Sequence, residues 1–343
     1  MSATAAKKIR IAILGATGYT ALEAIKLLLR HPGVEIVAAT SRSEAGKPIS
    51  AIHQSLAGRL DLKISELSPT ELAAKADCIF SCLPHGVTAD LVPDLLKAGL
   101  RIVDFSADYR LDDAATFKEW YDHEHSDPTR LGKVVYGLPE LFAEQLKGAD
   151  LVANNGCYTA TAILSLAPLV KANLIETTDI IIDAKSGVSG AGRTAKQNIL
   201  YCECNESMSA YGVGKHRHTP EIEQIIGRFT GSKIEVIFTP HLVPMDRGIL
   251  ATIYSKPTRA VTQAELLALY REFYADKPFV TIVDHLPTTK DTSGTNFCHI
   301  TARIVRGRIL TIASLDNLIK GASGGAVQNF NLMYGFPETM GLL

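Results

Sequence analysis

KIRIAILGATGYTALEAIKLLLR, residues 8–30, is the stretch that decides the fold of the first half of the chain. Residues 8–14 form a short, nearly continuous apolar run, which is typical of a strand in a parallel sheet covered on both faces. Small residues follow at Gly15, Gly18 and Ala21, and residues 22–30 then have helical apolar spacing. With a second strand predicted over 34–39, this order is that of a dinucleotide-binding unit.

The glycine turn supplies the physical argument for a nucleotide. Small residues let backbone N–H groups approach a pyrophosphate at the start of a helix. The spacing GxxGxxA is looser than GxGxxG, so an ordinary glycine turn is the alternative. The residues expected to contact the cofactor here are Gly15, Thr17, Gly18, Tyr19 and Thr20.

The end of the second strand distinguishes between the two nicotinamide cofactors. An NAD site places Asp or Glu there to bind the ribose 2′-hydroxyl. This chain instead has Ser41 and Arg42, whose hydroxyl and guanidinium suit a 2′-phosphate. The sequence therefore predicts NADP, with a solvated loop arginine as the alternative interpretation.

A second strand–turn–helix pattern contains the candidate nucleophile. NNGCYTAT, residues 154–161, follows an apolar run at 150–153 and precedes apolar residues at near-helical spacing. Cys157 is then at a helix N-terminus, where N–H groups and the helix dipole favour the thiolate and could stabilise an oxyanion. A buried core cysteine is the alternative.

A basic cluster precedes a further predicted helix over 221–226, with Thr219 and Pro220 as its expected N-cap and first turn. A general base beside anion-binding groups would have this composition, and a solvated basic loop is the alternative. The cluster consists of Lys215, His216, Arg217 and His218.

Three further segments carry polar side chains beyond predicted strands. Arg110 lies just past the strand at 101–105 and could bind an anionic group, or form a surface salt bridge. Residues 185–193, rich in Gly and Ser, could direct backbone N–H groups at phosphate or carboxylate. Residues 120–125, WYDHEH, lack a further ligand set, so we expect a polar loop and no metal site.

Composition limits the class of protein. The length of 343 residues argues for two domains, and a net charge of −1 gives no electrostatic case for nucleic acid or membranes. None of the six cysteines forms a CxxC pair, and residues 1–8 lack the apolar core of a signal peptide. We expect reduced thiols and a cytoplasmic location. The strand-rich second half has few connections long enough for parallel crossovers, which predicts a mixed or antiparallel sheet.

Six motifs together resemble the N-acetyl-gamma-glutamyl-phosphate reductase family (EC 1.2.1.38), NADPH-dependent enzymes of arginine biosynthesis in the aspartate-semialdehyde dehydrogenase superfamily. They are GATGYTALE, GCYTATAILSLAPL, DAKSGVSGAGR, YGVGKHRHTPEIEQ, FTPHLVPMDRG and DNLIKGASGGAVQN, spread over nearly the whole chain. The resemblance implies an α/β protein with a Rossmann-type NADP-binding domain, 1–156 and 317–343. An inserted catalytic α+β domain, 157–316, would have a mixed, largely antiparallel sheet and carry homodimer or homotetramer contacts.

The resemblance also implies residue roles. Cys157 falls on the nucleophile and His218 on the base; which of His216 and His218 contacts the thiol stays open, with His218 favoured. The residues expected at the substrate and its phosphate are Arg110, Lys215, His216 and Glu221. The cofactor contacts expected from the second half are Ser186, Gly187 and Asn317. Two departures stand out: Asn155 and Thr159 occupy positions where the family usually has proline, and Asn155 makes the turn less rigid.

The implied reaction proceeds through a cysteine thioester. Cys157 attacks N-acetyl-L-glutamyl 5-phosphate and expels phosphate, and hydride transfer from NADPH yields N-acetyl-L-glutamate 5-semialdehyde. One alternative is the same acyl-phosphate chemistry on the shorter substrate of aspartate-semialdehyde dehydrogenase. Another is a non-catalytic NADP-binding sensor.

Overall fold

The computed structural model describes residues 7–343 and resolves two compact units. The first unit consists of the described part of Met1–Lys118 together with Asp122–Asn154 and Ser323–Leu343. The second consists of Glu119–Tyr121 and Asn155–Ala322. Residues 1–6, most of the segment in which we expect no signal peptide, lie outside the described residues.

The first unit is built on a seven-stranded sheet in the order β3-β2-β1-β4-β5-β7-β6, and every strand pair in it is parallel. The strand order reverses between β1 and β4, the point at which doubly wound sheets bind nucleotides. The strands are β1 Ile9–Leu14, β2 Val34–Thr40, β3 Ile64–Ser65, β4 Cys78–Ser81, β5 Arg101–Asp104, β6 Val135–Gly137 and β7 Leu151–Asn154.

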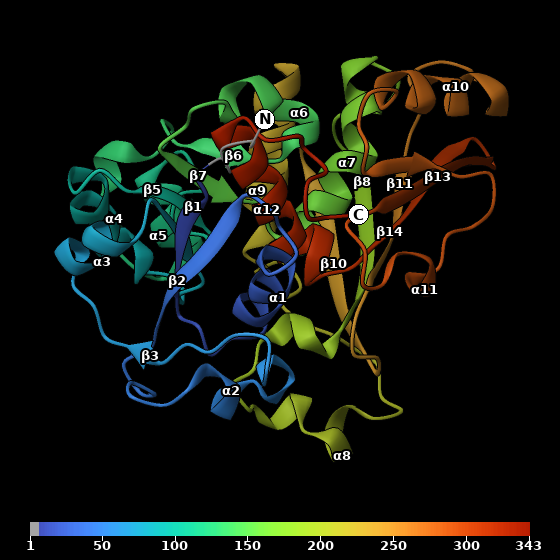
Figure 1. The fold of residues 1–343 in the computed structure, drawn as a ribbon. Coiled ribbons are helices and arrows are strands. Elements are labelled where there is room, and N and C mark those ends of the chain that lie inside the picture. The colour runs from blue at the N-terminus through green and yellow to red at the C-terminus, as the bar shows by residue number, and fades with distance from the viewer. Residues whose placement is uncertain (1–6) are drawn as a thin grey trace, which may run out of the picture. The chain divides into compact units, whose positions relative to one another are not determined.

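Helices connect these strands, and the C-terminal helix returns to the same unit. α12, Gly324–Tyr334, packs against α1 and α6, and the red helix lies beside the blue α1 in Figure 1. Just before α12, the hydroxyl of Ser323 donates to the carbonyl of Thr20 at 2.7 Å. The other helices are α1 Tyr19–Leu28, α2 Ile49–Ile52, α3 Pro69–Lys75, α4 Thr88–Lys97, α5 Ala114–Tyr121 and α6 Pro139–Leu146.

The second unit has a seven-stranded sheet in the order β12-β13-β14-β11-β8-β10-β9. Its central pairs β8–β11, β11–β14 and β14–β13 are antiparallel, whereas β8–β10 and β12–β13 are parallel, so the predicted mixed, largely antiparallel sheet is confirmed. The strands are β8 Ile180–Gly187, β9 Ser209–Ala210, β10 Val236–Val243, β11 Ile249–Ser255, β12 Val280–Ile282, β13 Cys298–Val305 and β14 Arg308–Leu315.

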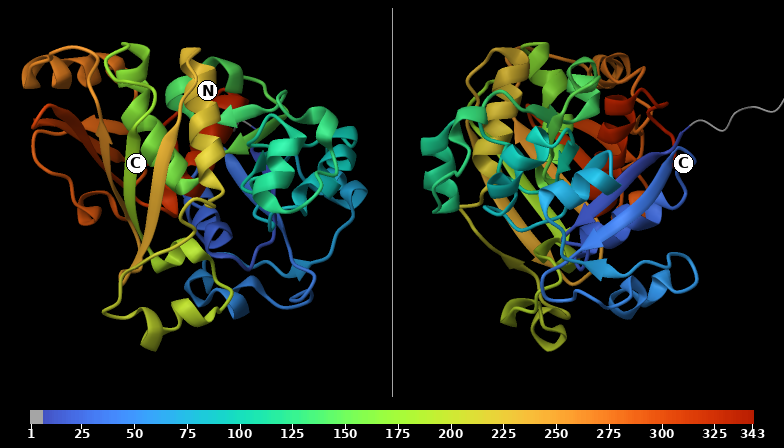
Figure 2. Two further views of the ribbon diagram at one scale, coloured as in Figure 1. Left: turned by 180° about the vertical axis from the view of Figure 1, so that it is seen from behind. Right: turned by 60° about the vertical axis from the view of Figure 1, so that its left-hand side comes forward.

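Helices cover one face of this second sheet. α7, Cys157–Lys171, packs on β11 and β14, α9, His218–Thr230, packs on α7 and β10, and α10, Gln263–Phe273, packs on β13 (Figure 2). α7 is buried along nearly its whole length because apolar residues lie all round it, as in a core helix. The two remaining short helices are α8 Tyr201–Cys204 and α11 Thr289–Thr292.

Two local predictions were wrong, and a third holds only in part. Trp120 and Tyr121 end α5, whereas residues 122–125 form the predicted loop; within it His125 is buried, with Nε2 2.7 Å from the carbonyl oxygen of Asp108. α9 begins at His218 with Arg217 as its N-cap. Thr219, the expected N-cap, is therefore the second residue of the helix. Residues 185–187 are strand, since β8 continues pairing with β10 and β11.

No helix among residues 7–343 combines the length and the apolar character that a membrane crossing requires.

Candidate active site

The glycine turn after β1 has the geometry of a nucleotide cradle. Gly15 has φ +70°, and a Cβ there would lie 2.6 Å from the carbonyl oxygen of Cys82, so only glycine fits. Gly18 caps α1 with extended backbone, φ −79° and ψ 165°, and a Cβ there would meet nothing closer than 3.8 Å. A side chain at Gly18 would therefore have room, and the N–H groups at the start of α1 are of the kind that bind an anion.

The end of β2 lies beside this turn. The N–H of Ala16 donates to the carbonyl of Thr40 at 2.9 Å, and Nε2 of His53 lies 2.8 Å from the carbonyl oxygen of Ala16. Beyond Thr40, the side chain of Arg42 is 84% exposed and makes a long ion pair of 3.9 Å with Glu66. The structure thus brings the predicted turn residues together with Ser41 and Arg42, and a guanidinium in this setting can reorient toward a phosphate.

The turn after β7 presents Cys157 at the start of a long helix. Gly156 is the N-cap of α7 with φ −79° and ψ 157°, and Cys157 is the first helical residue and partly buried. All six cysteines are described, and none of them is in a disulfide. The positive end of a fifteen-residue helix therefore faces a thiol, as predicted from the sequence.

Gly321 is a site residue that sequence reasoning missed. A Cβ at this position would lie 2.6 Å from the Cβ and 2.9 Å from the Cα of Cys157. Residues 319–323 form one turn of π-helix, a form of helix that is frequent at functional sites. Gly321 begins a run of small residues, 321–326, which allows close packing, but no local sequence spacing indicates that its partner is Cys157.

An aromatic and imidazole cluster surrounds the start of α7. The ring of Tyr158 lies 5.7 Å from His216 and 6.0 Å from His218, and the phenol of Tyr211 donates to that of Tyr158 at 3.3 Å. Burial raises the pKa of Tyr211 to about 12, the bond to Tyr158 opposes this, and the charge of Cys157 raises it further. Burial likewise raises the pKa of Tyr158. Both phenols thus stay protonated at physiological pH, and a charge on Cys157 would act on both of them.

The two histidines of the cluster differ in their surroundings. Burial and then the nearby charge of Arg217 lower the pKa of His216 to about 4. The backbone N–H of His218 also donates to Nδ1 of His216 at 3.2 Å. His216 is therefore neutral at physiological pH and already hydrogen-bonded, whereas His218 stands at the first position of α9.

Glu221 lies in the first turn of α9 and is fully buried. One oxygen, Oε1, accepts from the N–H of Gly156 at 3.1 Å and from the hydroxyl of Thr159 at 2.9 Å. In the structure this carboxylate contacts the turn before Cys157, whereas Lys215 is exposed.

Two other residues predicted to contact substrate or cofactor, Arg110 and Asn317, form hydrogen bonds to backbone groups. Arg110 is 6% exposed, and its Nε and Nη2 donate to the carbonyls of Asn154 and Phe105 at 2.8 and 2.9 Å. Asn317 is buried, accepts from the N–H of Gly248 at 2.8 Å and donates to Ser189 Oγ at 3.0 Å.

Two of the predicted cofactor contacts lie in the buried end of β8. A Cβ at Gly187 would lie 2.5 Å from the carbonyl oxygen of Asp246, and Ser186 is also buried. A Cβ at Gly190 would lie 3.0 Å from the hydroxyl of Ser186 and 3.7 Å from Nδ2 of Asn317. The structure therefore groups Ser186, Gly187 and Asn317 within the second unit.

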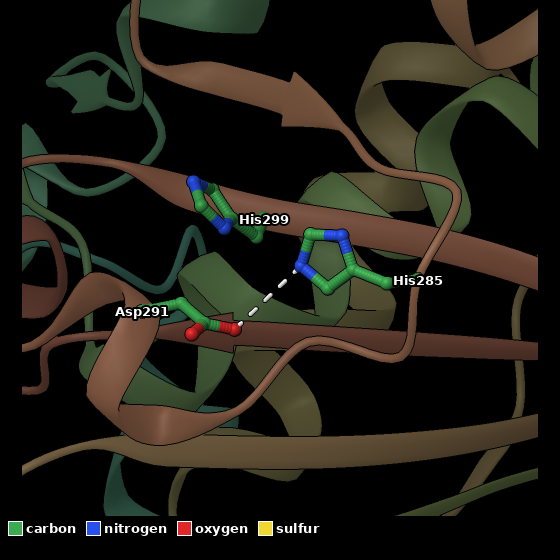
Figure 3. A group of neighbouring side chains, drawn as sticks. All are labelled: His285, Asp291 and His299. Carbon is green, nitrogen blue, oxygen red and sulfur yellow. Dashed lines mark ion pairs between the residues drawn. The ribbon is translucent and has the colours of Figure 1, made fainter.

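One group of side chains in the second unit has metal-ligand chemistry. Ligand atoms of His285, Asp291 and His299 lie within 4.8 Å of one another, and Figure 3 shows His285 and Asp291 turned toward each other with a 3.7 Å ion pair. Tetrahedral zinc ligands stand about 3.4 Å apart. Asp291 also accepts from the N–H of Thr288 at 2.7 Å as part of the α11 cap. The ligand atoms are thus spaced more widely than those of a tetrahedral zinc site, and Asp291 serves as part of the α11 cap.

A cleft of about 700 Å³ also opens in the first unit. It is lined by Leu100, Val135 and Leu151, at the amino-terminal ends of β5, β6 and β7. Doubly wound sheets bind ligands at the opposite, carboxyl edge. The cleft is therefore not the cofactor site.

Comparison with known proteins matches both units to one family. Residues 10–149 match the semialdehyde dehydrogenase NAD binding domain, and residues 157–317 match the semialdehyde dehydrogenase dimerisation domain. The aspartate semialdehyde dehydrogenase II of Vibrio cholerae, in complex with ASA, superposes with a TM-score of 0.73 at 17% identity, over 96% of this chain and 98% of that one. The Candida albicans aspartate semialdehyde dehydrogenase with NADP gives 0.71 at 18% identity, over 95% and 98%. These likenesses establish the fold.

Closer relatives establish the family. The N-acetyl-gamma-glutamyl-phosphate reductase of Rhodopirellula baltica is 54% identical over 340 residues, 98% of each chain. That of Citrifermentans bemidjiense is 50% identical over 339 residues, 97% of this chain and 98% of the relative. Identity at this level over almost the full length goes well beyond a shared fold. The chain belongs to the N-acetyl-gamma-glutamyl-phosphate reductase family, EC 1.2.1.38, the NAD(P)-binding oxidoreductases of arginine biosynthesis.

Proposed function

We propose that the protein reduces N-acetyl-L-glutamyl 5-phosphate to N-acetyl-L-glutamate 5-semialdehyde through a thioester on Cys157. The observation that carries this proposal is the placement of two side chains: Cys157 is the first residue of α7, and His218 is the first residue of α9, which packs on α7. A nucleophile and a base at the starts of two packed helices suit covalent acyl transfer.

The first step is attack on the acyl phosphate. The Cys157 thiolate forms a bond to the carbonyl carbon, and the carbonyl electron pair moves onto oxygen. N–H groups at the start of α7 stabilise that oxyanion. The C–O bond to phosphate then breaks, phosphate leaves with the electron pair, and a thioester remains on Cys157.

The second step reduces the thioester. NADPH bound at the Gly15–Thr20 turn supplies a hydride when present. The thioester carbon that accepts it becomes a thiohemiacetal, and His218 donates the proton that its oxygen takes up. Removal of that proton collapses the thiohemiacetal to the aldehyde and returns the Cys157 thiolate. His218 is favoured over His216 for this work because His216 has a pKa of about 4 and an occupied Nδ1.

NADP is the proposed cofactor because Arg42 follows β2 as an exposed cation and no carboxylate stands at residues 40–43. Arg110 and Lys215 are the proposed anion contacts. Lys215 is exposed, and two of the five N–H groups of the Arg110 guanidinium donate to the carbonyls of Asn154 and Phe105, which hold it in place. The roles of Ser186, Gly187 and Asn317 at the cofactor remain part of this proposal.

A homodimer or homotetramer is proposed through the second sheet. Strand register places Ile181, Ile237, Tyr254 and Leu310 on the face opposite α7, and each is only partly buried or exposed. An apolar face of this kind suits a second copy of the chain. Sedimentation velocity of the purified protein would measure the assembly.

A cytoplasmic location accompanies the proposal, because none of the described cysteines is in a disulfide.

The direct test runs the reaction in reverse. N-acetyl-L-glutamate 5-semialdehyde, NADP and phosphate should give NADPH, with phosphate required and aspartate semialdehyde at least about 100-fold poorer in kcat/KM. Oxidation independent of phosphate would contradict the thioester route. Preference for aspartate semialdehyde would contradict the substrate assignment.

A further inference from the structure

Gly156 is hydrogen-bonded through both its N–H and its carbonyl. Its N–H donates to Glu221 Oε1 at 3.1 Å, and its carbonyl accepts from Asn155 Nδ2 at 3.1 Å and from the N–H of Ala160 at 2.9 Å. The hydroxyl of Thr159 lies 2.7 Å from that carbonyl and 2.9 Å from Glu221 Oε1, and its single proton is donated to one of these two acceptors at a time. The side chains of Asn155, Thr159 and Glu221 are all at least 98% buried. Bonds in such a dry setting constrain geometry strongly.

The hydrogen bonds to Gly156 matter because they restrict the backbone of a glycine, the residue with the widest conformational freedom. Gly156 is the N-cap of α7 and has no side chain of its own to cap the helix. The residue that follows it is Cys157. Fixing both the N–H and the carbonyl of Gly156 therefore fixes the direction in which the thiol leaves the turn.

Glu221 links two helix starts. It stands in the first turn of α9 and binds the residue immediately before α7. The positive ends of both helix dipoles thus face one carboxylate, which offsets the cost of burying its charge. Cys157 and His218 are the first residues of these same two helices, so a bond between the helix starts also sets the separation of thiol and imidazole.

We propose that Glu221 is a positioning residue that joins the start of α9 to the start of α7, with Asn155 and Thr159 completing the hydrogen bonds around Gly156. It acts through Gly156 on the relative placement of Cys157 and His218. This rests on the proposed roles of Cys157 and His218, and it replaces the expected substrate contact of Glu221 with a contact to the turn.

The test compares Glu221→Ala with Glu221→Gln. Glutamine keeps an oxygen that can accept from the Gly156 N–H, whereas alanine removes the acceptor of that buried N–H and one of the two acceptors near the Thr159 hydroxyl. Glu221→Ala should lower kcat at least about 100-fold with little change in KM, as expected for a displaced nucleophile, and Glu221→Gln should recover all but about fivefold. Glu223→Ala, on the same helix, is the matched control and should leave both constants within about twofold.

A second readout needs no substrate. The rate of iodoacetamide alkylation at Cys157, followed on its peptide by mass spectrometry from pH 5 to 9, reports the thiol directly. Glu221→Ala should shift this profile, and Glu221→Gln should keep its shape. Equal rises in KM for both variants, with kcat and alkylation unchanged, would make Glu221 a substrate contact and overturn the proposal.

Thr159→Val serves if Glu221→Ala does not fold. It should lower kcat by about 3- to 10-fold, with rescue by Thr159→Ser; a Thr159→Val enzyme with wild-type kcat and alkylation would also refute the positioning role. The proposed function has its own separate test. It fails if wild-type protein does not turn over the semialdehyde, whereas the alkylation profiles of the Glu221 variants would still report on the turn.

Discussion

The turns that begin α1 and α7 have nearly the same backbone and different surroundings. Gly18 and Gly156 are both N-caps with φ −79°, their ψ values are 165° and 157°, and neither helix has a side-chain cap bond. The first turn is left open above Gly18. The second is enclosed by the side chains of Asn155, Thr159 and Glu221.

This difference shows how one helix start can serve two kinds of chemistry. An open N-terminus with small residues accepts a phosphate brought by a ligand. An enclosed N-terminus holds one thiol in one direction and uses its N–H groups on the developing oxyanion. In the first turn the carbonyl of Cys82 leaves no room for a side chain at Gly15, whereas in the second Glu221 binds the N–H of Gly156.

The largest expected effect comes from removing the thiol of the enclosed turn. Cys157→Ser should lower kcat by at least about 10³-fold, because serine at this position lacks the nucleophilicity of a thiolate. NADPH binding, measured by fluorescence titration, should be unchanged. Cys202→Ser, at an exposed thiol in α8, is the control and should keep wild-type turnover. Near wild-type activity in Cys157→Ser would exclude covalent catalysis.

A methyl group in the open turn tests the other side of the comparison. Gly15→Ala combines left-handed backbone with a 2.6 Å contact to the Cys82 carbonyl and should lower the free energy of unfolding by about 2–5 kcal/mol. Gly18→Ala has 3.8 Å of room and should cost less than about 1 kcal/mol. Urea denaturation of both variants gives the comparison, and equal losses would show that the turn does not depend on the Cys82 contact.

The two units should respond to pH in opposite directions. The folded pKa of His216, about 4, lies below the ordinary 6.5, so the unfolded chain binds the extra proton and the second unit loses up to about 3 kcal/mol as pH falls through that window. Burial and then Asp108 raise the pKa of Asp104 to about 7, so the folded first unit keeps a proton and loses stability as pH rises from about 4 to 7.

Hydrogen exchange resolved by segment would measure the two responses separately. His216→Phe should flatten the acid-side loss in the second unit, and Asp104→Asn should flatten the opposite trend in the first. If each variant left the pH dependence of its own unit unaltered, other groups would have to carry it.

The smallest effect distinguishes the cofactors. Arg42→Ala should raise KM for NADPH by about 10- to 100-fold and leave KM for NADH within about twofold, because only NADPH carries the 2′-phosphate. Arg30→Ala, an exposed arginine near the far end of α1, is the matched control. Equal changes with both cofactors would place Arg42 away from the 2′-phosphate.

Sequence patterns alone predict much of this site. Apolar runs, glycines and helix-start residues predicted β1, α1, β2 and the turn at Cys157, because these features depend on a few neighbouring residues. The start of α9 was misplaced by a residue or more, since helix ends are decided by contacts as well as by caps. His125 lies in the predicted loop, but its burial depends on an acceptor, the carbonyl of Asp108, that sequence spacing does not reveal.

The sequence by itself determined the class of fold, the position of a thiol at a helix start and the family to which the chain belongs. Each follows from local periodicity or from motif order along the chain. Only the tertiary structure decided that Gly321 packs against Cys157, that Glu221 binds Gly156 and that His216 is held neutral. These depend on packing and burial between residues distant in sequence, and no local spacing encodes those distances.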